Sequence, residues 1–316
     1  MANKYTSIGG QALIEGIMMK GPKKTTVAVR LPDGSIDLSE PKELHLKEKC
    51  KLLGWPIIRG VTTLIESMTV GYRALMTSAE KSGFAEEEGI TEEDKKKESG
   101  FMAAAMVIGS VLGVLLAVVL FMYIPSLLCK WCDAALGGFI LAHNLKALFE
   151  GILKIMVFLG YMAAVSLMKD IRRVFMYHGA EHKTIFCYEA KKELTVENVR
   201  NFKRFHPRCG TSFIFLVLIV SILVTSILTA VLPKAVITNN LLWVPMKILL
   251  IPVVCGFGYE LIRLCGRYDN VVTRIISAPG LWVQRLTTKE PADDMIEVAI
   301  AALKEVLPEE SDGEIV

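Results

Sequence analysis

Charged residues are scarce in this chain: they make up 22% of its 316 residues, while hydrophobic residues make up 52%. The mean hydropathy of +0.43 is too apolar for an ordinary soluble domain. The shortage of charge therefore excludes that class and indicates a membrane protein.

Several familiar signatures are also missing. The chain has no standard phosphate-binding glycine loop and no serine-centred nucleophile elbow. Its seven cysteines are odd in number and irregularly spaced, which is unlike a disulfide framework and favours a reduced or lipid-buried setting. The first 40 residues lack the basic start and apolar run of a signal peptide. We therefore expect the first membrane span to act as its own insertion signal.

Long apolar runs are present. Four of them are long enough to cross a bilayer, at residues 101–128, 147–168, 213–232 and 241–262. Pro245 and Pro252 are expected to bend the fourth. In the second run, Lys146, Glu150 and Lys154 recur every four residues and form one polar stripe. This stripe predicts either self-neutralising side chains that snorkel to the interface or a lipid-binding or transport site.

Basic residues are concentrated on one side of these runs. The segment between the second and third runs carries ten lysines and arginines, whereas the other two loops hold only flanking lysines. By the positive-inside rule, the N-terminus, this middle segment and the C-terminus are expected in the cytoplasm.

Outside the spans the sequence predicts a small α+β cytosolic part. Residues 25–31 and 35–38 alternate around a Pro-Asp-Gly turn, which is typical of a hairpin. Apolar positions over residues 61–79 predict an amphipathic helix that lies either on the membrane surface or against the cytosolic part. A last helix is predicted over residues 293–307.

We therefore expect a mainly α membrane protein with four transmembrane helices and a small α+β cytosolic part. The expected segments are an N-terminal hairpin and amphipathic helix (1–83), a charged linker (84–100), transmembrane helices 1 and 2 (101–168), a basic cytosolic loop (169–211), transmembrane helices 3 and 4 (212–264) and a cytosolic C-terminal segment (265–316).

The motif with most chemical content follows the second span. His178 and His182 are four residues apart and share one helix face, with Glu181 on the same side. This H-x-x-E-H order is the inverted form of the zinc-protease helix, in which two histidines hold a metal and the glutamate acts as a base.

The expected topology brings further ligands to the same interface, and three interpretations stay open. An open site would use His178, His182 and Glu260 for zinc, with Glu181 as the catalytic base of a hydrolase. A closed, structural zinc site would use His178, His182, His206 and Cys209. Without a metal, the histidines would simply form hydrogen bonds at a polar membrane face.

The basic loop suggests partners besides the lipid bilayer itself. Arg200, Lys203, Arg204 and Arg208 are interleaved with Phe202 and Phe205. This composition suits anionic lipid headgroups or RNA, such as a ribosome docked at the translocon. The ordinary positive-inside bias explains the same residues without either partner.

Four blocks of sequence resemble the YqhQ-like family of bacterial membrane proteins, at residues 9–19, 177–184, 206–213 and 279–288. The resemblance implies a multi-pass protein of the bacterial cell membrane, of a family labelled as predicted metal-dependent enzymes. The leading hypothesis is a membrane protein with a cytoplasm-facing metal site, acting as a metal-dependent hydrolase. The alternative is a non-enzymatic membrane factor that meets the ribosome or translocon through its basic cytosolic face.

Overall fold

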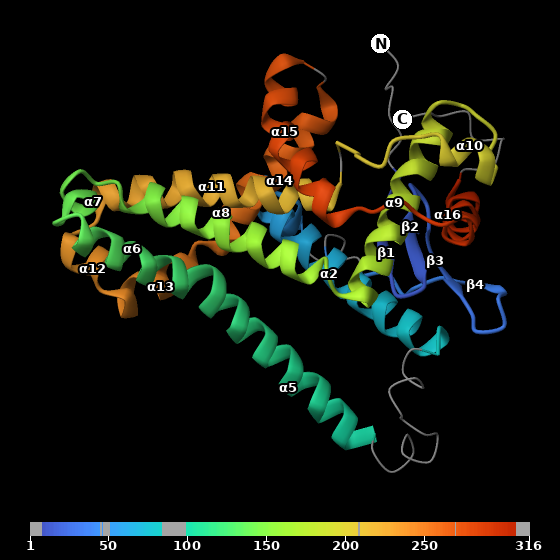
Figure 1. Cartoon of the computed structure of the whole chain (residues 1–316), viewed down its shortest axis with the longest axis horizontal. Helices are drawn as coiled ribbons and strands as arrows, with labels where there is room; N and C mark the ends of the chain where they lie inside the picture. Colours follow the sequence, from blue (N-terminus) through green and yellow to red (C-terminus); the bar gives the residue numbers. More distant parts are fainter. Residues whose placement is uncertain are drawn as a thin grey trace.

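The computed structural model describes residues 8–44, 46, 51–83, 99–207, 209–268 and 270–307. Most of the predicted charged linker and the acidic end after Pro308 lie outside these residues. The described chain is mainly helical with one small sheet. Figure 1 shows an elongated bundle of helices joined at one end to the part that contains the sheet.

The sheet is an antiparallel meander of four strands in sequence order: β1 (Gly9–Leu13), β2 (Gly16–Lys20), β3 (Thr25–Arg30) and β4 (Ile36–Ser39). The predicted hairpin is confirmed as β3 and β4, with Val29 opposite Asp37 and Gly34 at a positive φ of 86° in the turn. β1 and β2 arise from the glycine-rich apolar stretch before it.

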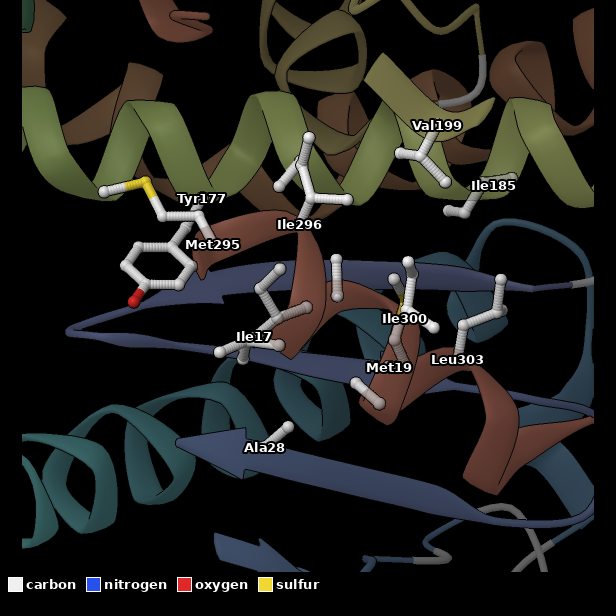
Figure 2. Packing of buried hydrophobic residues seen from close by; sticks show 14 of the residues in the cluster. Ile17, Met19, Ala28, Tyr177, Ile185, Val199, Met295, Ile296, Ile300 and Leu303 are labelled. Carbon is white, nitrogen blue, oxygen red and sulfur yellow. The ribbon is translucent and has the colours of Figure 1, made fainter. Parts of the chain in front are cut away.

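Helices cover both faces of this sheet, which explains why its central strands are buried on both sides. On one face, Ile17 and Met19 pack against α9 (Lys169–Glu189) and α16 (Asp293–Val306), as Figure 2 shows. On the other, Met18 packs with Val70 of α2 (Ile58–Lys81). Each such side chain contributes about 1.5–3 kcal/mol when fully buried. The predicted last helix is confirmed as α16.

The bundle contains three helical segments that are long and apolar enough to cross a membrane: Val111–Ala135, Lys146–Val165 and Gly210–Val231. The first runs through α5 (Ser99–Val118), the π-helical turn η2 (Val119–Tyr123) and α6 (Ile124–Ala135). The other two are α8 (Lys146–Val165) and α11 (Gly210–Val231). These three confirm the first three predicted spans by length and composition.

The fourth predicted span is not one helix. It is broken into α13 (Asn240–Leu249) and α14 (Ile251–Arg267), which are bent by 44°. Pro252 follows the break directly and has no N–H with which to continue the hydrogen bonds of α13. The described chain therefore has three candidate spans, or four if the bent pair is one span.

The predicted amphipathic helix is α2, and it packs within the protein. Val70 and Ala74 face the sheet, and Gly60 lies so close to α14 that a Cβ there would be 2.7 Å from Tyr259 Cβ. Its other face leaves Met68 and Ile65 exposed. The remaining short elements are η1 (Lys51–Gly54), α7 (Phe139–Ala142), α10 (Val196–Arg200) and α12 (Lys234–Thr238).

One long helix, α15 (Val271–Thr287), was not predicted. Its N-cap residue is Asn270, whose side chain accepts a hydrogen bond from the Thr273 N–H, while the Asn270 N–H donates to the Thr273 hydroxyl. Pro279 lies inside it. The helix packs along the first turns of α11. These tertiary contacts stabilise a helix at Pro279-Gly280, where the local sequence favours a turn.

Candidate metal centre

Two elements from distant parts of the chain meet at the H-x-x-E-H motif. The predicted helix is confirmed as α9, and it places the rings of His178 and His182 side by side, with centroids 4.5 Å apart. Cys209 is the N-cap residue of α11, where its sulfur accepts from the Thr211 N–H at 3.5 Å. The Cys209 thiol, at the start of the third candidate span, therefore lies next to the two histidines.

His178, His182 and Cys209 form a compact group of possible metal ligands. One ligand atom from each lies within 4.8 Å of the others. His178 Nε2 is 3.1 Å from Cys209 Sγ. His182 and Cys209 are buried, with exposed fractions of 1% and 8%. Nitrogen and thiolate ligands in this number suit zinc.

Backbone carbonyls fix both histidine rings. His178 Nδ1 lies 2.8 Å from Thr287 O, and His182 Nδ1 lies 2.5 Å from Arg204 O. Because a carbonyl oxygen can only accept, each Nδ1 carries the proton, and in a neutral ring Nε2 then offers a lone pair. His182 Nε2 is buried without a hydrogen-bond partner. Metal-ligating histidines are held by this same kind of outer contact, so these residues fit a bound metal ion.

Helix α15 forms hydrogen bonds that hold His178 and the segment before Cys209 in place. Gln284 is fully buried; its Oε1 accepts from His206 N–H, and its Nε2 donates to His206 O, both at 2.7 Å. Nε2 also lies 3.0 Å from Ser212 Oγ. One turn later, Thr287 supplies the carbonyl for His178. A single helix therefore holds a ligand ring and the chain that leads to Cys209.

Glu181 lies beside the group, packed against strand β1. A Cβ added to Gly10 would be 2.9 Å from the Glu181 carboxyl carbon, so only glycine fits there. Burial raises the pKa of Glu181 to about 6, although His178 and the Gly10 N–H act to lower it. Its Oε2 atom is buried without a hydrogen-bond partner. A carboxylate with a pKa this close to neutrality is suited to accept a proton.

The two remaining predicted ligands have other neighbours. Glu260 accepts two hydrogen bonds from the Arg59 guanidinium, at 2.6 and 2.5 Å, because α14 turns this carboxylate toward α2. His206 Nε2 lies 3.9 Å from Glu189 Oε2, and its ring is 5.5 Å from that of His182. The structure thus brings together three of the five candidate ligands. His178 and His182 belong to both predicted sets, and Cys209 belongs to the closed set. Cys209 stands where the open set placed Glu260.

Part of the predicted basic face is neutralised within the chain. Arg200 pairs with Asp293 at 2.5 Å, and Arg204 pairs with Glu290 at 3.0 Å. Lys183 also contacts Glu290. The acidic partners lie about ninety residues away, at and before the start of α16. No local sequence pattern therefore predicts that these charges are paired.

Sequence reasoning also missed the residues that position the site. Gln284, Thr287 and Gly10 lie within the sequence blocks that resemble the family, but their residue types alone assign them no role. The Arg204 and Thr287 carbonyls belong to the backbone, and no residue type marks them. Membership of these blocks is the sequence feature that could have marked the supporting residues, because the structure brings all four blocks to the same place.

Comparisons with known proteins show the family of the chain. A family model described as "Protein of unknown function (DUF1385)" matches residues 55–309. The uncharacterized protein YqhQ of Bacillus subtilis (strain 168) is 35% identical over 304 residues, which cover 95% of this chain and 92% of that protein. The chain belongs to the YqhQ-like family. No solved structure matches it. The region matched by the family model includes the ligands of the candidate metal centre and α15, and it begins after the sheet of this YqhQ-like protein.

Proposed function

We propose that this YqhQ-like protein is a membrane protein that binds a transition-metal ion, best matched by zinc, at His178, His182 and Cys209. The observation that carries the proposal is the orientation of the two imidazoles. The Nδ1–H of each ring donates a hydrogen bond to a backbone carbonyl, and Nε2 of His178 faces the sulfur of Cys209. Such an arrangement supplies two nitrogen lone pairs and one thiolate to a common point.

The same ligand set favours a catalytic over a structural role. Three protein ligands leave a fourth position for water, and zinc bound in this way lowers the pKa of that water toward neutrality. Glu181 is the residue that we assign to accept the proton, because it is buried on the same helix and its Oε2 has no other partner. The reaction class is therefore metal-dependent hydrolysis.

Metal content of the purified full chain tests the binding site. We expect a stoichiometric amount of zinc in the unmodified protein, and a loss of most of it in His178→Gln and in Cys209→Ser. The matched controls are His143→Gln, an exposed histidine, and Cys132→Ser, a cysteine outside the group. Both should retain the metal. Absence of any bound transition metal from the unmodified protein, purified without chelator, would contradict the proposal.

Cobalt substitution separates the open from the closed site. With an open position, added azide should shift the cobalt absorption bands, and His206→Gln should keep the metal. Glu181→Gln should also keep the metal while shifting the ionisation that a pH titration of the cobalt spectrum detects near neutrality. If azide leaves the spectrum unchanged and His206→Gln loses the metal, the site is a closed structural one and the hydrolase assignment is wrong.

A further inference from the structure

Helix α15 has two faces of opposite character. Its inward face, with Gly280, Gln284 and Thr287, is buried against α11 and the candidate metal centre. Large apolar side chains are exposed on its outward face and at the end of α14. Their exposed fractions are 50% for Leu264, 52% for Tyr268, 72% for Val271, 63% for Val272, 67% for Ile275 and 69% for Trp282.

The position of α15 is set by the third candidate span. Gly280 of α15 packs on Ser212, in the first turn of α11, at the end of that span nearest α9. Figure 1 shows α14 and α15 rising together across the direction of α8 and α11. If α11 crosses the bilayer, a helix that stands across its first turns lies at the level of the membrane surface.

The charge of this helical pair matches such a surface. Residues 261–288 contain four arginines and one acidic residue, Asp269. Arg263 is exposed beside Leu264, and the Arg285 guanidinium lies over the Trp282 ring, 5.0 Å from its centroid. Tryptophan and arginine next to an apolar stripe are typical of helices that lie in the headgroup region of anionic membranes.

We propose that the outward face of α15, with the end of α14, is a membrane-interface surface that inserts its apolar stripe among anionic phospholipid headgroups. A hairpin that formed part of a soluble domain would not leave these large apolar side chains in water. The surface is independent of the metal proposal, because it uses the face of α15 opposite to Gln284.

Fluorophore depth measurements test the surface. The test uses the full chain with Cys50, Cys132 and Cys265 replaced by serine. In this background Ile275→Cys is labelled with an environment-sensitive dye. Single copies of the labelled protein are placed in phosphatidylcholine–phosphatidylglycerol nanodiscs. We expect stronger quenching by a spin label near the lipid headgroup than by one at the acyl-chain end. Quenching by aqueous iodide should be several-fold weaker than at Ser35→Cys, in the exposed turn of the β3–β4 hairpin.

Two further sites calibrate the result. Val114→Cys, on an exposed position of the first candidate span, should be quenched most by the deep spin label. Val272→Cys should reproduce Ile275→Cys if the latter perturbs the fold. Iodide quenching at both α15 positions equal to that at Ser35→Cys would overturn the proposal. Protection from both lipid and aqueous quenchers would also overturn it, since a protein partner or a second copy would then cover the face.

The charge requirement is tested with the same labelled chain. Its emission should shift further toward blue when phosphatidylglycerol is added to phosphatidylcholine, and added salt should reverse the shift. Arg263→Gln with Arg285→Gln should remove most of that lipid dependence. An emission that is identical in both lipid compositions would contradict the anionic part of the proposal.

Discussion

At the scale of single residues, the orientation of His178 depends on how closely the chain near Thr287 approaches α9. A Cβ on Gly179 would lie 2.1 Å from Lys289 O, so this approach requires a glycine. The Lys289 N–H donates to Phe175 O at 2.8 Å, which fixes the segment on the helix. Because Gly179 has no side chain, the Thr287 carbonyl can reach the His178 ring.

Gly179→Ala should separate this segment from α9. We expect a loss of about 2–3 kcal/mol of stability, typical of overpacking a buried contact, together with weaker zinc binding. Gly160→Ala is the matched control, because Gly160 is also inside a helix but has no atom within 4 Å of an added Cβ. The control should be neutral or stabilised by up to about 1 kcal/mol. Thermal unfolding and zinc content measure both, and equal stability of the two variants would contradict the argument.

The candidate ligands of the site are easier to predict than the residues that hold them in place. The spacing of His178 and His182 fixes their relation on any helix, and topology brings Cys209 to the same membrane face. Glu260 was expected there for the same topological reason, but topology does not resolve which neighbour a carboxylate faces, and Arg59 holds it. Backbone carbonyls such as Thr287 O carry no sequence signature, so the outer contacts of the histidines could not be predicted.

At the scale of elements, the predicted polar stripe of α8 proves to be part of a buried network that joins several helices. Glu150 is the centre, and each of its oxygens has two partners. Oε1 lies 2.7 Å from Ser126 Oγ and 3.3 Å from Lys146 Nζ, while Oε2 lies 2.9 Å from Trp243 Nε1 and 3.0 Å from Lys247 Nζ. Four donors surround this carboxylate, and they connect α6, α8 and α13.

Replacing Glu150 should loosen the packing of α13 against α6 and α8. Glu150→Leu leaves two buried ammonium groups without their carboxylate, and breaking a buried ion pair in this way costs roughly 3–5 kcal/mol. The triple variant Lys146→Met, Glu150→Leu and Lys247→Met removes all three charges and should recover most of that loss. Unfolding of the three proteins in the same detergent gives the comparison. A Glu150→Leu protein as stable as the unmodified chain would refute the central role of Glu150.

Elements with strong periodicity or uniform apolarity could be predicted, and so could the bend in the fourth run, from its prolines. What the prolines do not predict is that α13 and α14 are two separate helices that meet at Leu250. Helix α15 escaped prediction because Pro279-Gly280 is typical of a turn. Gly280 is needed instead for the close approach to Ser212, which keeps the helix intact through packing.

At the scale of the whole molecule, the two ends of the bundle differ in both structure and charge. One end adjoins the sheet, α9 and α16; the other carries only the short helices α7 and α12 and their connections (Figure 1). Residues 169–209 hold ten lysines and arginines, while residues 136–145 hold none and residues 232–240 hold one. Although several of the ten are ion-paired in the folded protein, the positive-inside rule acts on the charges present near the span ends during insertion.

We therefore expect the end with the sheet to face the cytoplasm of the bacterial cell. A green fluorescent protein fusion at the C-terminus should be fluorescent, and alkaline phosphatase fused after Leu136, at the opposite end, should be active; the reverse pattern would refute this orientation. The orientation matters for the metal proposal because the cytoplasm keeps thiols reduced. Cys209 would then remain available as a thiolate ligand, whereas on the outer side the same thiol would be open to oxidation, which removes a metal ligand.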